Sequence, residues 1–373
     1  MRALAIRVAA SVAAIAFALL VSGLALALIG ESPLTAFGSM ASYGVQLSSL
    51  ISIVNRAIPL YLSALAVGVG FKMGLFNIGV EGQYSIAALV AAAAGAAVAL
   101  PAVLHVGLIV VVAMAVGAAW AGIAGVLKVY RNVHEVIATI MLNFIATGVG
   151  AYLLAYYFRE ASVSGDVNIR TPEIPASGLF PSLNPVLEAV GLEIPGGSDL
   201  QGFVLVAVLV GVVYYLLVWR TRFGYDLRAV GTNPQAAEAG GVSPGAMVIK
   251  AMLLSGGIAG LVGLSQVLGF FGRYTLDFPT GFGFAGIAVA LVGRNHPVGM
   301  GFAALLFAFL NRSAQILDFE QIPKEIEVII QGVIILSVVI AYEIARRIIS
   351  ARQVAEAAAD VRTAETEPEG ASA

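Results

Sequence analysis

The sequence predicts an all-α polytopic membrane protein with about ten transmembrane helices (eight to ten) and both termini in the cytoplasm. Composition is the first reason: 60% of the 373 residues are hydrophobic and 11% are charged. Soluble domains average about 45–50% apolar and about 25% charged residues. A bilayer can solvate outward-facing Leu, Val, Ile and Phe that a soluble chain of this size could not bury. The recurrence of long apolar segments and the placement of basic residues point the same way.

Ten apolar segments are candidate transmembrane helices. They are 8–30, 50–71, 83–100, 104–127, 136–158, 203–219, 247–271, 281–293, 297–311 and 328–345. The first is long enough to span, since a crossing needs about 20 residues and a signal-peptide core has about 7–15. The Gly-rich segment 281–293 is the shortest, so we expect it to be short or re-entrant, with its backbone satisfied by protein or a cavity.

The basic residues agree with a cytoplasmic N-terminus and ten crossings. This layout places 14 of the 20 Lys and Arg residues inside, as the positive-inside rule requires. The six outside are Arg56, Arg159, Arg170, Arg273, Arg312 and Lys324. We therefore expect a membrane domain over 1–350, with an extracytoplasmic loop at 159–202 and a cytoplasmic loop at 220–247. Residues 351–373 are poor in apolar residues and predict a disordered cytoplasmic tail.

Several classes of function are excluded or disfavoured. The net charge of −2 argues against a nucleic-acid partner, and the absence of Cys excludes disulfides and thiolate sites. The three His residues lie far apart and predict no metal site, and no catalytic set or P-loop motif occurs. The pattern G-x-G-x-x-G at 281–286 does not indicate a dinucleotide site, because apolar membrane segments flank it and no acidic residue follows about 20 positions on. It indicates close helix packing instead, as do the Gly residues at 256–263.

The segment 220–244 is the most informative part of the chain. Asn233 is a good helix N-cap and Pro234 a good first helical residue, while Gly240 and Gly241 provide a stop. The short, Ala-rich helix between them has too few large apolar residues to form part of a core. It is either a surface presented to a partner or an ordinary capped linker.

Four stretches, in matching order, resemble one family of importer permeases. They are 74–83, 134–143, 228–237 and 283–293. The family serves ribose, other simple sugars, nucleosides and branched-chain amino acids, and the resemblance covers roughly 50–345. The first two stretches resemble the nucleoside branch, in the larger of its two paired permeases. The chain departs from the sugar branch at Phe76-Asn-Ile-Gly79. The segment 235–240 is only loosely similar to the Glu-Ala-Ala…Gly pattern of other importer permeases.

The resemblance implies the membrane-spanning permease subunit of an ATP-binding-cassette (ABC) importer in the bacterial inner membrane, without an enzymatic site of its own. Its solute would be small and polar, a nucleoside first. Implied partners are cytoplasmic ATPases that bind ATP and magnesium, a second permease, an extracytoplasmic binding protein and membrane lipid. The residues implied in coupling to the ATPase are Asp226, Arg228, Ala229, Gly231, Asn233, Pro234, Ala236, Ala237 and Gly240.

Polar residues at membrane depth are the candidates for the translocation path, because such groups are costly and face the bundle interior or water. They are Asn77, Glu81, Gln83, Asn143 and Gln266. Each either lines the path or forms interhelical hydrogen bonds, worth about 0.6 kcal/mol on average. Glu81 could instead pair with Lys72. Glu135, after His134, indicates a charged helix start rather than a proton relay.

Three alternatives remain open. The first is an ABC permease for a simple sugar such as ribose or xylose. The second is an ion-coupled secondary transporter, which would need buried acidic residues or paired broken helices. An intramembrane enzyme is the weakest, because the sequence offers no catalytic set.

Overall fold

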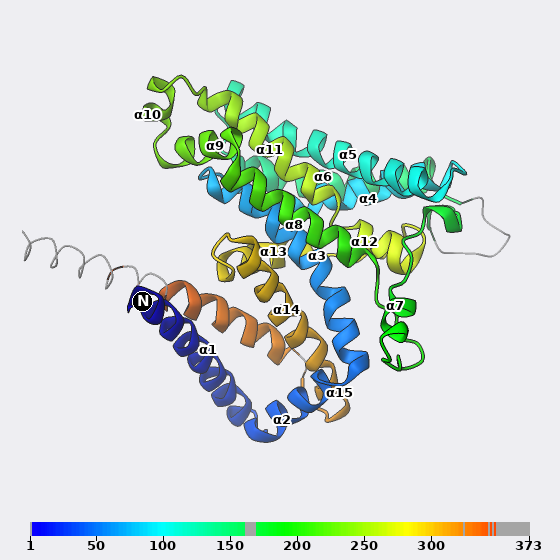
Figure 1. Ribbon diagram of the computed structural model, residues 1–373, viewed down its shortest axis with the longest axis vertical. Coiled ribbons are helices and arrows are strands. Elements are labelled where there is room, and N and C mark those ends of the chain that lie inside the picture. Colours follow the sequence, from blue (N-terminus) through cyan, green and yellow to red (C-terminus); the bar gives the residue numbers. More distant parts are fainter. Residues whose placement is uncertain (1, 161–168, 324, 342–343, 345–346, 348–373) are drawn as a thin grey trace, which may run out of the picture. The chain divides into compact units, whose positions relative to one another are not determined.

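The computed structural model describes residues 2–160, 169–323, 325–341, 344 and 347, and in this part of the chain the regular elements are helices. Two isolated β-bridges, Arg170 with Thr275 and Ser182 with Gln201, are the exceptions. The helices are α1 Arg2–Leu28, α2 Pro33–Gly44, α3 Leu47–Lys72, α4 Val80–Ala96, α5 Ala102–Arg131, α6 Glu135–Tyr156, η1 Ala176–Gly178, α7 Asn184–Ala189, α8 Phe203–Arg220, α9 Arg222–Thr232, α10 Pro234–Ala239, α11 Pro244–Gly260, α12 Leu264–Gln266, η2 Val267–Phe271, α13 Phe282–Val292, α14 Pro297–Ser313 and α15 Gln315–Phe319 (Figure 1).

Each of the ten predicted apolar segments coincides with a helix, the last of them over Ile326–Ala341. Six helices in the described residues are long and apolar enough to cross a membrane, or up to seven if the bent pair α1 and α2 forms one span. The polytopic membrane fold is therefore confirmed, while ten crossings stays a prediction. The tail predicted at 351–373 lies outside the described residues.

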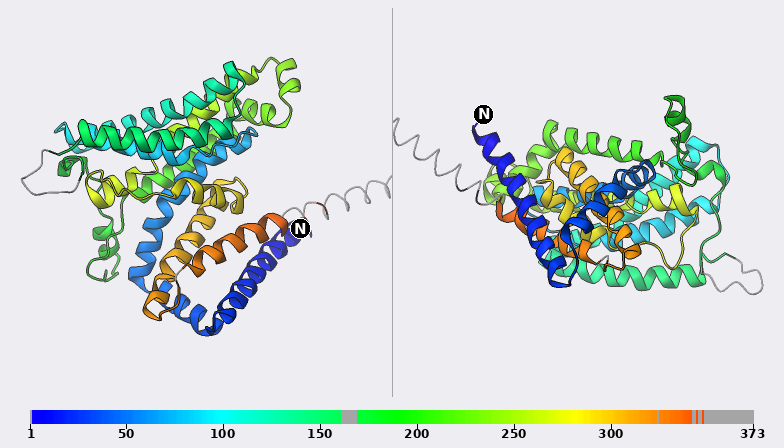
Figure 2. Two further views of the ribbon diagram at one scale, coloured as in Figure 1. Left: turned by 180° about the vertical axis from the view of Figure 1, so that it is seen from behind. Right: turned by 90° about the horizontal axis from the view of Figure 1, so that it is seen from below.

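The chain divides into two units. The larger, residues 42–313, contains α3 to α14 and every predicted site residue. In it α4, α5, α6 and α11 lie side by side, and α3 packs against α8, α11, α13 and α14 (Figure 2). The smaller unit comprises residues 1–41 and 314–373, and in it the Ser39 hydroxyl donates a hydrogen bond of 2.5 Å to the Glu320 carboxylate.

Small residues bring α5 and α11 into close contact. A Cβ added to Gly256 would lie 2.3 Å from the carbonyl oxygen of Gly117, and one added to Gly260 would lie 2.1 Å from that of Ala113. Backbones can approach this closely only where side chains are absent, which is the usual device of membrane helix pairs. The interpretation of the Gly-rich stretch at 256–263 as a packing surface is confirmed.

The helices α4 and α13 are short, and both begin against residues of other helices. The start of α4 contacts Asn143, which lies eight residues after Glu135 at the start of α6 and thus about 12 Å along that helix. The start of α13 in turn contacts Glu81 of α4. The prediction that the Gly-rich segment forms a short helix is confirmed, and its 11 residues are too few to cross a bilayer alone.

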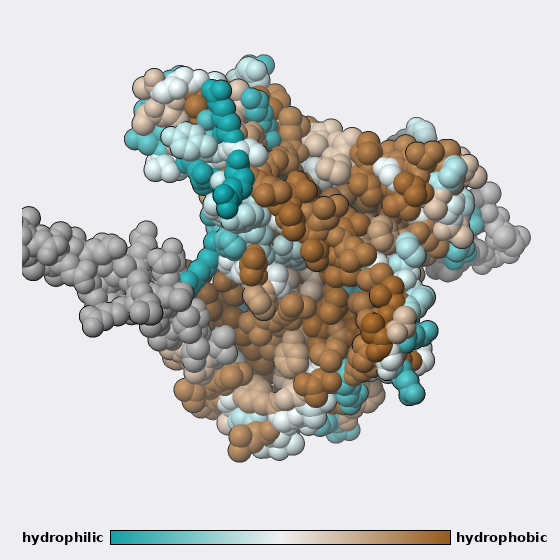
Figure 3. Space-filling view, viewed as in Figure 1, coloured by the Kyte–Doolittle hydropathy of each residue, from teal (hydrophilic) through white to brown (hydrophobic). Residues whose placement is uncertain are grey.

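The surface of the larger unit is divided by polarity. In Figure 3 a broad hydrophobic area separates the polar end that carries α9 and α10 from the polar loop that carries α7. Many large apolar side chains on α5, α6 and α8 are exposed, such as Val111, Phe144 and Leu209. Such a surface is stable only against lipid or another membrane subunit.

Candidate functional site: two helix starts inside the bundle and a capped cytoplasmic segment

Asn77 lies at the centre of a closed hydrogen-bond network before α4. Its amide nitrogen donates to Gln83 at 3.1 Å and to Ser255 at 2.8 Å, and its amide oxygen accepts from the Gly79 N–H at 2.9 Å and from Gln83 at 3.0 Å. Ser255 on α11 donates onward to the Ala66 carbonyl of α3 at 2.7 Å. Both amide side chains are buried, and the Asn77 amide uses both of its N–H donors and accepts two hydrogen bonds. This network therefore joins α3, α4 and α11 at one point.

Asn143 satisfies the backbone on both sides of the same helix start. Its amide oxygen accepts from the Gly82 N–H at 2.9 Å, and its amide nitrogen donates to the Ile78 carbonyl at 3.0 Å. A Cβ on Gly82 would lie 2.9 Å from the Cα of Asn143, so only Gly permits this approach. The first amides of a helix have no partner within it, and Asn143 and Asn77 supply partners here.

Glu81 caps a neighbouring helix across the bundle. Its carboxylate accepts hydrogen bonds from the N–H groups of Gly281 at 2.6 Å and Gly283 at 2.8 Å, and from the Tyr84 hydroxyl at 2.8 Å. A negative charge is favourable at a helix N-terminus, here that of α13. Lys72 instead lies over the Trp219 ring, 4.9 Å from its centroid. The pairing of Glu81 with Lys72, one of the alternatives from the sequence, is not found.

Gln266 differs from the other four predicted path residues. It ends α12, immediately before the π-helical turn η2, and its side chain is half-exposed. Within the described part of the chain its amide has no hydrogen-bond partner. A single π-turn often marks a functional position in a helix. The structure thus brings Asn77, Glu81, Gln83 and Asn143 together around two helix starts, and Gln266 takes no part in the hydrogen bonds given there.

Three helix caps define the predicted cytoplasmic segment. The Thr221 hydroxyl accepts from the Gly224 N–H at 3.2 Å, the Asn233 side chain from the Ala236 N–H at 3.0 Å, and the Ser243 hydroxyl from the Ala246 N–H at 3.4 Å. They begin α9, α10 and α11, and Pro follows the cap in the last two. The predicted short helix after Asn233 is confirmed as α10, and α9 before it was not predicted.

The helix α9 is fastened to the ends of two membrane helices. The Arg228 guanidinium donates to the Val218 carbonyl of α8. Gly231 lies against the end of α3, where an added Cβ would come within 2.4 Å of the Lys72 carbonyl oxygen. Asp226 forms a long ion pair of 4.0 Å with Arg222, and Ala229 is half-buried. Arg228 and Gly231 therefore anchor the segment, whereas the Asp226 pair lies within α9.

Most of the exposed predicted coupling residues lie on α10 and its two caps, and Gly231 on α9 is exposed as well. Asn233, Pro234, Ala236 and Gly240 are exposed, whereas the Ala237 side chain is buried beneath them. The sequence did not single out Tyr225, whose side chain is 65% exposed at this polar end. An exposed aromatic residue beside a capped polar helix is the composition expected of a protein interface.

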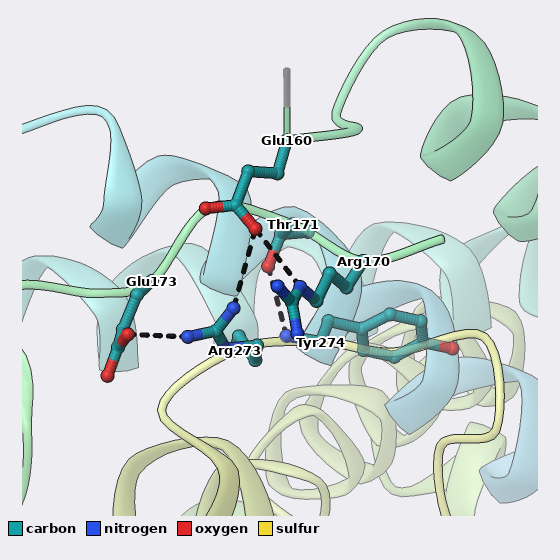
Figure 4. A network of polar contacts seen from close by, with 6 residues as sticks. All are labelled: Glu160, Arg170, Thr171, Glu173, Arg273 and Tyr274. Atoms are coloured by element: carbon teal, nitrogen blue, oxygen red, sulfur yellow. Dashed lines mark hydrogen bonds and ion pairs between the residues drawn. The ribbon is translucent and has the colours of Figure 1, made fainter. Parts of the chain in front are cut away.

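The loop predicted to be extracytoplasmic is held against the connection after η2 near Glu160 and over 170–174, whereas its helix α7 buries no residue. Arg273, after η2, pairs with Glu173 at 2.5 Å and with Glu160 at 3.4 Å, and Glu160 also pairs with Arg170 at 3.0 Å (Figure 4). The Thr171 hydroxyl accepts a hydrogen bond from the backbone N–H of Tyr274 at 3.0 Å. The loop is thereby tied to the connection that leads into α13.

His105, His134 and Glu135 have structural partners. His105 lies between the Ser177 hydroxyl at 2.9 Å and the Gly95 carbonyl at 2.8 Å. His134 caps α6, and Glu135 in its first turn pairs with Lys128 at 2.5 Å. The charged helix start is thus the arrangement observed there. In the described residues no group of three His, Asp or Glu side chains could hold a metal ion.

Helices that begin inside a membrane bundle next to a non-helical segment are typical of solute transporters. Residues 49–339 match the family described as "Branched-chain amino acid transport system / permease component", and the chain belongs to that family. It is an integral, multi-pass protein of the cell membrane and the permease subunit of an ABC transporter.

Curated relatives agree with this assignment. The chain is similar to the glucose ABC transporter permease protein TsgB13 of Haloferax volcanii, at 34% identity over 330 residues, covering 86% of this chain and 83% of that protein. The guanosine permease protein NupP of Bacillus subtilis is 36% identical over 293 residues (78% and 81%). The nucleoside permease protein NupB of Lactococcus lactis is 29% identical over 340 residues (88% and 90%). Bacillus subtilis has a further guanosine permease protein, NupQ, 26% identical over 281 residues (71% and 82%).

Proposed function

We propose that this permease imports a nucleoside, working with two ATPase domains, a second permease and an extracytoplasmic binding protein. The similarity to permeases named for guanosine and nucleosides supports the solute class. NupP and NupQ occur as two permease proteins named for one solute in one organism, which supports a heterodimer. ATP and magnesium would be bound by the ATPase, because this sequence contains no P-loop motif.

The proposed topology has ten crossings with both termini in the cytoplasm. The excess of Lys and Arg on one side supports it. In this topology α9 and α10 face the cytoplasm, and the loop at 159–202 faces outward, where the binding protein delivers solute. The short helices α4 and α13 then complete their crossings together with the non-helical segments before them, so that their starts lie within the membrane, an arrangement found near the solute sites of transporters.

The observation that supports coupling most directly is the anchoring of α9 and α10. An ATPase that docks on the exposed surface of α10 would move α9, which is fixed to the ends of α3 and α8 through Gly231 and Arg228. It would also move α11, which begins four residues after Gly240 and carries Ser255 to the start of α4. ATP-driven motion would thus reach both short helices through rigid elements.

We propose different roles for the five polar residues of the path. Asn77, Gln83 and Asn143 position the start of α4, since their amides are already bonded within the protein. Glu81 positions the start of α13. Gln266 is the residue we assign to solute contact, because its amide is half-exposed and a nucleoside presents hydroxyl and base groups that require such partners.

Uptake of radiolabelled guanosine by cells that express the permease with its ATPase and binding protein tests the function. We expect uptake that requires the ATPase and is competed by adenosine or inosine. Competition by ribose, xylose or glucose instead would replace the solute class with sugars, for which the similarity to TsgB13 is the supporting observation. Uptake by the purified permease alone, driven by a proton or sodium gradient, would make it a secondary transporter.

A further inference from the structure

An apolar groove of about 740 Å³ runs along the larger unit between α3, α8 and α14. Its walls are mainly aliphatic, with Ile58 from α3, Val208 and Val212 from α8, and Val298 and Leu305 from α14 among them. Only Tyr61, Tyr215 and His296 contribute polar side chains. A nucleoside would leave most of its hydroxyl and base groups without partners here, whereas a hydrocarbon chain would not.

The length of the groove matches that of a lipid chain. Along α8 it runs from Val204 to Tyr215, eleven helical steps and therefore about 16 Å. Half of the hydrocarbon core of a bilayer is about 15 Å, which is the depth that one leaflet occupies. An acyl chain would therefore fill the groove over much of its length.

Aromatic rings surround the end of the groove at Tyr215 and His296. The Trp219 ring stacks on Tyr215 with centroids 5.5 Å apart and lies 5.4 Å from the His296 ring. Lys72 places its ammonium group 4.9 Å above Trp219. Trp and Tyr concentrate at the depth of lipid headgroups, so this end lies at a membrane surface, the cytoplasmic one in the proposed topology.

The positive charge at this end has no acidic partner. Arg228 lies about one turn of α9 before Gly231, which packs against the Lys72 carbonyl at the end of α3. Within the described part of the chain neither of these two cations forms an ion pair, and Arg220, exposed one residue beyond Trp219, forms none either. Cations at this end of α8 and α3 without a carboxylate favour an external anion, and a phosphate at headgroup depth supplies one.

We propose that this groove binds a phospholipid with an anionic headgroup. One acyl chain occupies the groove between α3, α8 and α14, and the phosphate lies against Lys72 and Arg220. The apolar walls select the chain, while the cations select an anionic lipid over a zwitterionic one. The site is separate from Gln266 and from the helix starts, so it does not depend on which solute is transported.

Native mass spectrometry of the purified, full-length complex tests the proposal. The complex is incubated with equal amounts of phosphatidylglycerol and phosphatidylcholine, and the retained lipid is counted. Gly301→Leu should fill the groove, because a Cβ at Gly301 meets only the Tyr61 ring, at 3.8 Å. Gly148→Leu is the matched control on α6, where an added Cβ meets nothing within 4 Å. Lys72→Gln removes a headgroup cation, and Lys250→Gln removes an exposed cation of α11 as its control.

We expect the wild-type complex to retain phosphatidylglycerol at least fivefold over phosphatidylcholine. Gly301→Leu should lose the tightly held lipid, and Lys72→Gln should keep a lipid but lose the preference, while both controls match the wild type. Equal retention of the two lipids by the wild type, or undiminished retention by Gly301→Leu, overturns the proposal. A preference that survives Lys72→Gln and Arg220→Gln together also overturns it, since the cations would then not select the headgroup.

Discussion

Replacing Glu81 by Gln separates its possible roles, because the two side chains have nearly the same shape. The carboxylate accepts three hydrogen bonds, from Gly281, Gly283 and Tyr84. The Gln amide nitrogen cannot accept, so at least one of these donors loses its partner. A buried donor without a partner costs about 1–3 kcal/mol. Removing the negative charge from the start of α13 costs about 0.3–1 kcal/mol more.

Together these two costs come to about 1.3–4 kcal/mol. We expect Glu81→Gln to lower the free energy of unfolding by about 2 kcal/mol, toward the lower end of this combined range, because Glu81 is half-buried. The measurement is equilibrium unfolding in mixed detergent micelles, followed by circular dichroism. Glu238→Gln on exposed α10 is the control and should stay within about 0.5 kcal/mol of the wild type.

The outcomes distinguish three explanations for Glu81. If it caps α13, stability and uptake fall together. If it contacted solute, Glu81→Gln would raise the KM for uptake at unchanged stability, which would refute the capping role. If it paired with Lys72, then Lys72→Gln would destabilise the protein as much as Glu81→Gln does, and this too would refute the assignment.

Three further predictions concern other parts of the molecule. Ala236→Glu on the exposed surface of α10 should lower ATP-dependent uptake at least tenfold without affecting membrane insertion, whereas Ala236→Ser should transport normally; unchanged uptake in the Glu variant would remove α10 from coupling. Arg273→Gln should make the outer loop more sensitive to added protease while changing global stability by less than about 1 kcal/mol, because its ion pairs are partly exposed. Gly256→Leu should abolish the monodisperse peak in size-exclusion chromatography, because its side chain would meet the α5 backbone, while Gly148→Leu should not; a well-folded Gly256→Leu would contradict the close packing.

The sequence was sufficient for the membrane class, because that depends on composition and on the length of apolar segments. It also located α10, since Asn233 and Pro234 form a local cap and Gly240 a local stop. The small-residue interpretation of Gly256 and Gly260 held for the same reason, as close helix packing leaves a direct mark on composition.

Only the tertiary structure decided what the polar residues do. The residues Asn77 and Ser255 are 178 positions apart, and Glu81 lies 202 positions from Gly283, so no local pattern could pair them. Hydropathy records how much polarity a segment contains, but not where each donor finds its acceptor. The helix starts at α4 and α13 are stable inside the bundle because distant side chains satisfy their free N–H groups. The sequence by itself placed this chain in the membrane, and the fold determined which of its buried polar groups hold the helices together.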